Sequence, residues 1–489
     1  MSLFDMPPEI LCYILSLLDP KTLLGSSSVC RAWLEIIRGT PRLEYKIQLW
    51  TDGLSTGMSD FQTAAAGLQA IRQRRRAWRN LEWGSQNVID MPGLQASKAY
   101  DLINGVLAIQ DGSGSFWTRS LDDDPAAASS TKHFAALGIG IDSDTFEDFV
   151  IDPTQDLLVV LYHTADDVAG LAFLTLSQHE SHPMARYPTL TLEVDSYPLQ
   201  VSMQIADDMI GLCSCLPGRL RIWNWRKGEL LCNLYNRRGN FPSFQFLSPR
   251  SFVLGVPGKY FRIDIYVIHE GSPDRAFRAA ALGLPEITDR WFLRAIEIHS
   301  GPFCARPAGR SSFDSDNTAR IYLFWLEYVD HSAAHERRYV RLFVHHRTLY
   351  HYVSQHLRKG RLWYCDLLWN EWGPQSTRVL EGNPYRLTRH VHGERALFPD
   401  PEGNSLHLLD FGVFPGHPEP DTGSGTLIMG PSTLSGDNMP FKDTLTTYLP
   451  FRRATRQMDT EYEAFVMDQD HIVGVNPSIN EQMTVFTLR

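Results

Sequence analysis

The sequence predicts an α+β protein with several domains: a small N-terminal unit of three helices, a helical linker and a large all-β domain. Three observations lead to this prediction. Apolar residues recur at helical spacing up to about residue 79, and good helical patterns are nearly absent after residue 80. From there, short runs rich in β-branched and aromatic residues alternate with turn-forming residues. These runs recur about every 40 residues, a period typical of β-propeller blades.

Composition limits the class of protein further. The chain has 489 residues, 43% of them hydrophobic, so it can bury a large core. Its net charge of −10 gives no electrostatic reason to expect a nucleic acid or an anionic membrane as partner. We find no membrane-spanning apolar run and no secretory signal, and the 7 scattered cysteines fit reduced thiols. We therefore expect a soluble protein of the cytoplasm, the nucleus or both.

The first predicted helix begins at a pair of prolines. Pro7 and Pro8 suit the first turn of a helix, where no backbone N–H is needed. Asp19 and Pro20 can end this helix and begin the next, and residues 26–28 offer serine caps for a third. The apolar residues of the first helix follow at helical spacing: Ile10, Leu11, Ile14, Leu17 and Leu18. So short a unit cannot enclose so many large side chains, which indicates a docking face.

The segment from 6 to 43 resembles an F-box, the motif that joins a protein to a cullin-type ubiquitin ligase through a Skp-family adaptor. Met-Pro-Pro-Glu-Ile, Asp-Pro and Val-Cys-Arg-Ala-Trp occur in the expected order, and Met6 replaces the usual Leu with a side chain of similar volume. The resemblance implies an adaptor-binding surface anchored by Leu18 and Trp33. By their positions in the F-box motif, the residues assigned to this adaptor-binding surface are Pro7, Ile10, Leu11, Ile14, Leu18, Leu23, Leu24, Val29, Cys30 and Trp33. The alternative is a helical cap that packs on the rest of the chain.

A helical linker is predicted next, with apolar residues on one face between Ser59 and Trp78. Two interpretations fit the arginines that it carries. In the first interpretation the arginines form a nuclear-localisation or nucleic-acid patch. In the second they stabilise the helix by lying near the negative end of its dipole and by pairing with acidic neighbours. The second is favoured because no lysines join the cluster and the chain is acidic. The arginines are Arg72, Arg74, Arg75, Arg76 and Arg79.

The remainder of the chain resembles β-propellers in general and a WD-type blade around residues 222–229. Fungal F-box proteins often combine an F-box with such a domain, and this chain resembles that type. We expect the F-box in residues 1–50, the linker in 51–79 and the propeller in 80–489. About 400 residues allow six to eight blades, and the competing architecture is a pair of β-sandwiches.

No pattern in the chain indicates catalysis. His331 and His335 are four residues apart, but the His-Glu-x-x-His order of a zinc site is missing. Cys213 and Cys215 have no second cysteine pair at zinc-like spacing. We therefore predict no catalytic residue, no metal and no cofactor.

The resemblance implies a substrate-recognition subunit of a Skp–cullin–F-box type ubiquitin ligase, with a Skp-family adaptor, a cullin bound through it, and a protein target as partners. The alternatives are a non-degradative F-box scaffold and a propeller-fold hydrolase. Polar loops at 120–133, 305–318 and 415–425 are candidates for target recognition, since loops on a propeller gather at its faces. The residues that contact a target cannot be named from the sequence.

Overall fold

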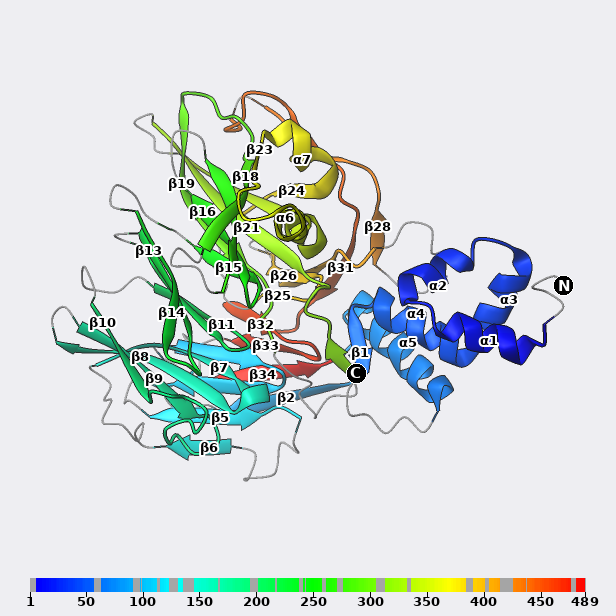
Figure 1. The fold of residues 1–489 in the computed structure, drawn as a ribbon, viewed down its shortest axis with the longest axis horizontal. Helices are drawn as coiled ribbons and strands as arrows, with labels where there is room; N and C mark the ends of the chain where they lie inside the picture. Colours follow the sequence, from blue (N-terminus) through cyan, green and yellow to red (C-terminus); the bar gives the residue numbers. More distant parts are fainter. Residues whose placement is uncertain are drawn as a thin grey trace.

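A computed structural model shows the N-terminal helices lying against a ring of small β-sheets (Figure 1). The described residues are 6–56, 63–90, 97, 99–111, 115–122, 131–134, 145–165, 168–193, 201–215, 218–236, 241, 243–256, 261–270, 276–304, 313–331, 336–383, 390–400, 404–413, 425–436, 438–475 and 481–488. Most of the three polar loops named above therefore lies outside the described residues.

The N-terminal helices are α1 (Pro8–Ser16), α2 (Pro20–Ser26), α3 (Arg31–Gly39), α4 (Pro41–Thr51) and α5 (Ala64–Asn80). The first two begin where proline and Asp19 predict, but the expected serine caps of the third are wrong, because Ser26 ends α2 and α3 begins after Cys30 without a side-chain cap. The Asp19 carboxylate accepts a 3.0 Å hydrogen bond from the Thr22 N–H and so caps α2. The unit has a fourth helix beyond the three expected, because Pro41 starts α4 directly after α3.

In the described part of the β domain, seven sheets of four or five strands each form one blade of a propeller. Blade 1 holds β3 (Ala99–Ile103), β4 (Val106–Gln110), β5 (Phe116–Ser120) and β6 (Thr131–Phe134). Blade 2 holds β7 (Phe146–Asp152), β8 (Leu157–Ala165), β9 (Val168–Thr175) and β10 (Thr189–Glu193). Blade 3 holds β11 (Val201–Ala206), β12 (Met209–Ser214), β13 (Gly218–Asn224) and β14 (Glu229–Asn236). Blade 4 holds β15 (Phe244–Ser248), β16 (Ser251–Val256), β17 (Arg262–Ile268), β18 (Ala276–Gly283) and β23 (Cys365–Leu367).

The last three blades carry the insertions of the domain. Blade 5 holds β19 (Trp291–His299), β21 (Ile321–Asp330), β22 (Arg337–His345) and β24 (Thr377–Glu381). Blade 6 holds β25 (Val391–His392), β26 (Arg395–Pro399), β27 (Ser405–Asp410), β31 (Phe451–Gln457) and β28 (Thr426–Ile428). Blade 7 holds β32 (Ala464–Met467), β33 (His471–Val475), β34 (Gln482–Thr487) and β2 (Ser85–Asp90). Two small sheets pair β1 (Leu54–Thr56) with β20 (Phe313–Ser315) and β29 (Ser432–Leu434) with β30 (Leu445–Thr447).

The hydrophobic core is divided into one cluster at each interface between neighbouring blades. For example, Leu158 of blade 2 packs with Phe116 of blade 1, and Trp223 of blade 3 packs with Phe173 of blade 2. Blade 7 contacts blade 1 through a further cluster that contains Val473. The sheets therefore form a closed ring of seven blades, within the predicted range of six to eight, and a pair of β-sandwiches is wrong.

Strands from the beginning and the end of the β domain close the ring together. β2, the first strand after α5, pairs antiparallel with β34 and becomes the outer strand of blade 7. Val88 lies opposite Thr484 in this register. Ring closure therefore joins the start of the β domain to its last strands.

Strand direction decides which loops share a face of the propeller. Because neighbouring strands run antiparallel, the connections between first and second strands all lie on one face, and those between second and third strands lie on the other. The N-terminal helices contact the first of these faces. One contact is the pairing of β1 with β20, which follows β19 and precedes β21 in the sequence. The other joins α5 to the turn from Asp468 to His471, which connects β32 and β33. We call this face the helical face.

Two helices interrupt the β domain, contrary to the near absence of helical patterns after residue 80. They are α6 (His346–Lys359) and α7 (Trp369–Ser376), which lie with β23 between β22 and β24. α6 buries His346, Leu349, Val353 and His356 at nearly helical spacing. The sequence pattern did not reveal α6 because two of its four buried positions are histidines, which count as polar in a search for apolar periodicity. Among the described residues, no helix combines the length and the apolar character needed to cross a bilayer.

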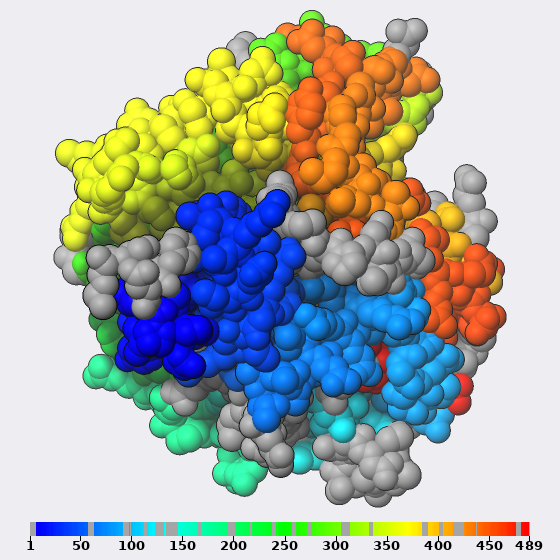
Figure 2. Space-filling model, turned by 90° about the vertical axis from the view of Figure 1, so that its right-hand side faces the viewer, coloured from blue at the N-terminus to red at the C-terminus, as the bar shows by residue number. Residues whose placement is uncertain are grey.

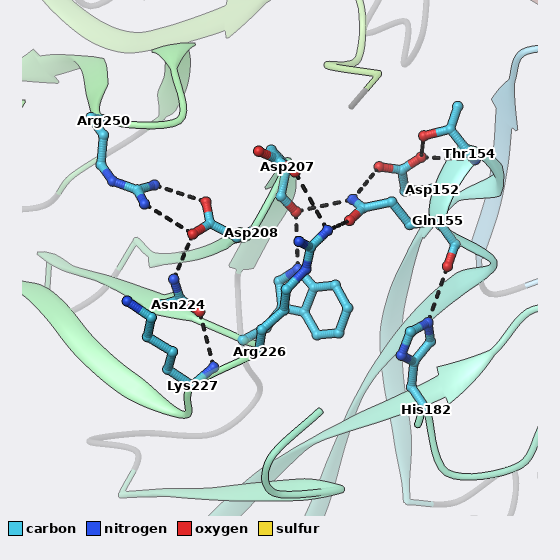
Figure 3. A network of polar contacts seen from close by, with 11 residues as sticks. Asp152, Thr154, Gln155, His182, Asp207, Asp208, Asn224, Arg226, Lys227 and Arg250 are labelled. Carbon is cyan, nitrogen blue, oxygen red and sulfur yellow. Dashed lines mark hydrogen bonds and ion pairs between the residues drawn. The ribbon is translucent and has the colours of Figure 1, made fainter. Parts of the chain in front are cut away.

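A polar network joins blades 2, 3 and 4 on the helical face (Figure 3). The Arg250 guanidinium binds Asp208 through two hydrogen bonds of 2.8 and 2.9 Å, and the Asn224 amide donates to the same carboxylate at 2.6 Å. Arg226 donates to Gln155, whose own amide donates to the Asp207 carbonyl at 3.0 Å. The network supplements the hydrophobic clusters at two interfaces between blades.

We predict that Asp208→Asn lowers the free energy of unfolding by about 2 kcal/mol at neutral pH, because Arg250 loses a charged partner. Burial alone would raise the pKa of Asp208, but the hydrogen bonds and charge of Arg250 outweigh it and lower this pKa. The carboxylate therefore stabilises the fold above its ordinary pKa near 4, and this contribution is lost as the pH falls through its lowered pKa. Urea unfolding at several pH values should show the two proteins converging in acid. A difference that is independent of pH would contradict the prediction.

Candidate functional site

The exposed face of α1 is the most apolar surface of the N-terminal unit. Ile10, Tyr13, Ile14 and Leu17 lie at i, i+3, i+4 and i+7, so they share one side of the helix. All four are exposed, and Leu17 reaches 69%. Val29, before α3, is exposed to the same extent. The chain therefore leaves a stripe of large apolar side chains without a cover.

The opposite face of α1 helps to form a small core. Leu15 packs with Leu23, Ile37, Leu43 and Ile47, all of them buried. Lys46 of α4 donates hydrogen bonds of 3.0 and 2.6 Å to the carbonyl oxygens of residues 16 and 18. These bonds satisfy backbone acceptors at the end of α1 and hold that helix on α4. The exposed stripe is thus displayed on a fixed helix.

The ten residues predicted for the adaptor surface divide into three groups in the structure. Pro7, Ile10, Ile14 and Val29 are exposed. Leu18, Leu24, Cys30 and Trp33 are partly buried, and three of these pack against the small core: Leu18, Leu24 and Trp33.

Leu11 and Leu23 are buried within the chain, Leu23 completely, so neither side chain is presented at the surface. Leu23 turns inward because it fills the space between α1, α3 and α4. Tyr13 and Leu17 extend the exposed stripe, although the prediction omitted them. Their helical spacing from Ile10 and Ile14 was the signal that could have found them.

A groove of about 460 Å³ lies among the other helices of this unit. The end of α2, α3 and α4 form its walls, with Leu24, Cys30, Leu34 and Ile47 as apolar lining and Arg31 at its edge. Polar and charged side chains, among them Arg38, Glu44 and Gln48, complete the lining, so the groove is a mixed concave region of this unit.

The arginines of α5 join the unit to its surroundings. Arg75 donates to the Asp52 carboxylate at 2.9 Å and to the Gln48 side chain at 2.5 Å, and both members of the ion pair are about nine-tenths buried. Arg74 reaches the turn before β33, where it donates to Asp470 at 3.1 Å and to the Gln469 carbonyl at 2.5 Å.

Two further arginines on α5, both exposed, pair with carboxylates: Arg72 with the mostly buried Glu44 at 2.6 Å, and Arg76 with the exposed Glu82 at 3.4 Å. Four of the five arginines thus bind carboxylates, which agrees with the ion-pair interpretation. A nucleic-acid patch would need positive charges that are free to bind phosphates. Because carboxylates neutralise four of the five, the nucleic-acid interpretation is not supported.

Apolar contacts complete this junction. Trp78, at the end of α5, is fully buried in the cluster between blades 6 and 7, together with Leu397 and Phe465. Leu54 of β1 packs with Phe313 of β20 and Ile71 of α5. Figure 2 shows the result, with the N-terminal helices, in blue, lying in front of the β domain. The exposed stripe therefore has a defined position relative to the propeller.

The N-terminal unit matches a known family model. The family is described as F-box-like, and the match covers residues 3–47. This segment is an F-box-like domain. No curated protein matches the chain.

The F-box-like domain is followed by a domain similar in fold to WD40 propellers. The WD40 repeats of RRP9 share 9% identity, with a TM-score of 0.39 over 82% of this chain and 98% of that one. The WD40 propeller domain of Doa1 shares 10%, with a TM-score of 0.36 over 83% and 97%. A chain of the mitotic checkpoint complex shares 9%, with a TM-score of 0.39 over 84% and 96%. These similarities concern the fold alone.

The cysteine and histidine candidates that the structure describes form no metal-binding cluster. Within the described residues, no group of three or more His, Cys, Asp or Glu side chains could hold a metal ion. Burial raises the pKa of the Cys213 and Cys215 thiols, so both are protonated at neutral pH. His335 lies outside the described residues, so the pair with His331 is not described.

We predict that Arg75→Ala loosens the junction and lowers the free energy of unfolding by about 3 kcal/mol, because it leaves the buried Asp52 carboxylate without its charged partner. Arg72→Ala is the matched control on the same helix. Its ion pair with Glu44 is exposed on the arginine side, so it should cost less than about 1 kcal/mol. Hydrogen exchange of α4 and α5 in the full chain would localise the effect. Equal protection in the two variants would contradict the prediction.

Proposed function

We propose that the chain is the substrate-recognition subunit of a Skp–cullin–F-box type ubiquitin ligase. The F-box-like domain would bind a Skp-family adaptor, and a cullin through it, while the propeller binds a protein target. The observation that carries this proposal is the exposed apolar stripe of α1 on a domain that matches the F-box-like model. A stripe of this size, without cover on a folded unit, marks an interaction surface.

The proposed adaptor surface consists of the predicted residues that remain accessible, with Tyr13 and Leu17 added. Cys30 lines the groove between α2, α3 and α4, and Val29 beside it in the sequence is exposed. Leu18 and Trp33 contribute partly buried side chains, and they also support the core beneath. On this proposal Leu11 and Leu23 do not contact the adaptor. Their buried side chains pack between the helices and so hold the exposed stripe in position.

The proposed mechanism is proximity. The chain needs no active site of its own, because holding a target beside a ubiquitin-loaded enzyme raises the effective concentration of the target's lysines. On this proposal residues 1–50 bind the adaptor and residues 80–489 recognise the target. Residues 51–79 form the helical linker between these two domains. The buried contacts of α5 would keep the distance between the two binding functions nearly constant.

The test is coexpression of the full chain with a Skp-family adaptor, followed by size exclusion. We expect a stoichiometric complex for the wild type and at least about 100-fold weaker binding for Ile14→Asp with Leu17→Asp, because each change removes about 1.5 kcal/mol or more of apolar burial. Neither residue belongs to the buried core, so the β domain and the F-box core should remain folded.

The matched control places the same changes elsewhere. Leu230→Asp with Tyr235→Asp alters two exposed apolar residues of β14 and should leave adaptor binding unchanged. Retained binding by the α1 variant would overturn the adaptor assignment. A complex that forms but supports no cullin-dependent ubiquitylation of captured partners would instead establish the non-degradative scaffold.

A further inference from the structure

The insertion between β22 and β24 displays a second apolar surface, separate from the F-box-like domain. Its helix α6 starts on the helical face, because connections between third and fourth strands return to that face, and β23 then runs parallel to β18 along the outer edge of blade 4 toward the other face. In Figure 2 the insertion is yellow and lies beside the blue helices. Leu362 is 92% exposed and Leu368 74% exposed, and Leu357 and Tyr364 are more than half exposed.

Hydrogen bonds hold this surface in place. α6 ends at Gly360, whose positive φ of 102° turns the chain, and the Trp363 N–H donates to the Gly360 carbonyl at 3.0 Å. The fully buried His356 places Nδ1 2.7 Å from the Trp363 carbonyl, which can only accept, so Nδ1 donates. Its Nε2 lies 2.9 Å from Nε2 of His269 on blade 4. Leu362 is therefore displayed by an ordered turn.

Three cations lie among these apolar side chains: Arg358, Lys359 and Arg361. Within the described part of the chain, no carboxylate forms an ion pair with any of them. Arg358 donates to the Gln355 side chain at 2.7 Å, and Lys359 lies 4.6 Å from the centre of the Trp363 ring.

The nearby acids have other partners. Asp366 faces Arg278 at 3.9 Å, and Glu371 accepts from the Leu368 N–H at 2.7 Å. In a chain with a net charge of −10, the surface is a local concentration of positive charge around exposed apolar groups.

We propose that this surface binds an acidic segment of a partner protein. We call it the 357–368 surface; it consists of Leu357, Arg358, Lys359, Arg361, Leu362, Tyr364 and Leu368. Carboxylates of the segment would pair with the three cations, and its apolar side chains would cover Leu362 and Tyr364. A nucleic acid or an anionic membrane fits less well, because three cations are few and the rest of the chain would repel a polyanion. The inference does not depend on adaptor binding.

The test uses a short fluorescein-labelled peptide that alternates Asp or Glu with Leu or Phe, titrated with the full chain. Fluorescence anisotropy should show binding that weakens as salt rises. Arg358→Glu with Lys359→Glu and Arg361→Glu should weaken binding about tenfold or more, because like charges then face each other. Leu362→Ser with Tyr364→Ser should also weaken it about tenfold, since covered apolar area is lost. All these side chains are exposed, so the variants should fold.

A control of equal charge separates local from global effects. Lys227→Glu with Lys442→Glu and Arg453→Glu makes the same change in net charge at exposed positions outside the surface, and it should alter affinity less than about twofold. Equal losses in the control and surface variants would overturn the proposal. Tighter binding to phosphatidylserine vesicles or to single-stranded DNA than to the peptide would also overturn it. Because no adaptor takes part, these outcomes are independent of the F-box experiment.

Discussion

Closure of the ring by β2 and β34 is the constraint on which the rest of the arrangement depends. α5 ends at Asn80 and β2 begins at Ser85, so the helix must finish within a few residues of the closing strand. Leu81, in a left-handed backbone conformation with φ of 51°, turns the chain between them and is itself fully buried. Blade closure therefore determines where α5 lies, and α5 determines where the F-box-like domain lies.

The junction combines three kinds of contact with different physical roles. Burial of Trp78 between blades 6 and 7 supplies apolar stabilisation, and the pairing of β1 with β20 prevents rotation of the segment between α4 and α5. The ion pair of Arg75 with Asp52 orients α5 against α4, because its planar guanidinium also reaches Gln48. A covalent linker alone would permit many orientations. Here α5 and β1 pack directly on the propeller through two separate apolar clusters.

Local chemistry in the sequence anticipated much of this structure. Proline at helix starts and aspartate at a cap located the first helices, since these residues act on the backbone next to them. The recurring short apolar runs indicated blades, because each blade must bury its own strands. Pairings between distant segments left no such signal. Gln482 and Asp90 meet at the ring closure although they are 392 residues apart, and β2 has little alternation of buried and exposed side chains.

The adaptor surface was anticipated in part, for a related reason. Apolar periodicity shows that α1 has a stripe, but the side that faces inward depends on packing against other helices. Leu23 is buried because the helices around it leave a space that it fills, and no pattern in its own helix reveals that space. α6 was missed because His346 and His356 are buried through specific hydrogen-bond partners, which hydropathy does not register.

The closing strand has a consequence for how the chain is made. Synthesis proceeds from the N-terminus, so the F-box-like domain and β2 leave the ribosome well before β34 does. During that interval β2 has no hydrogen-bonding partner, and the apolar stripe of α1 is already present on its helix. A partner that covers the stripe early would shield the nascent chain while the ring is still open. Binding through the N-terminal helices could thus begin before the propeller exists.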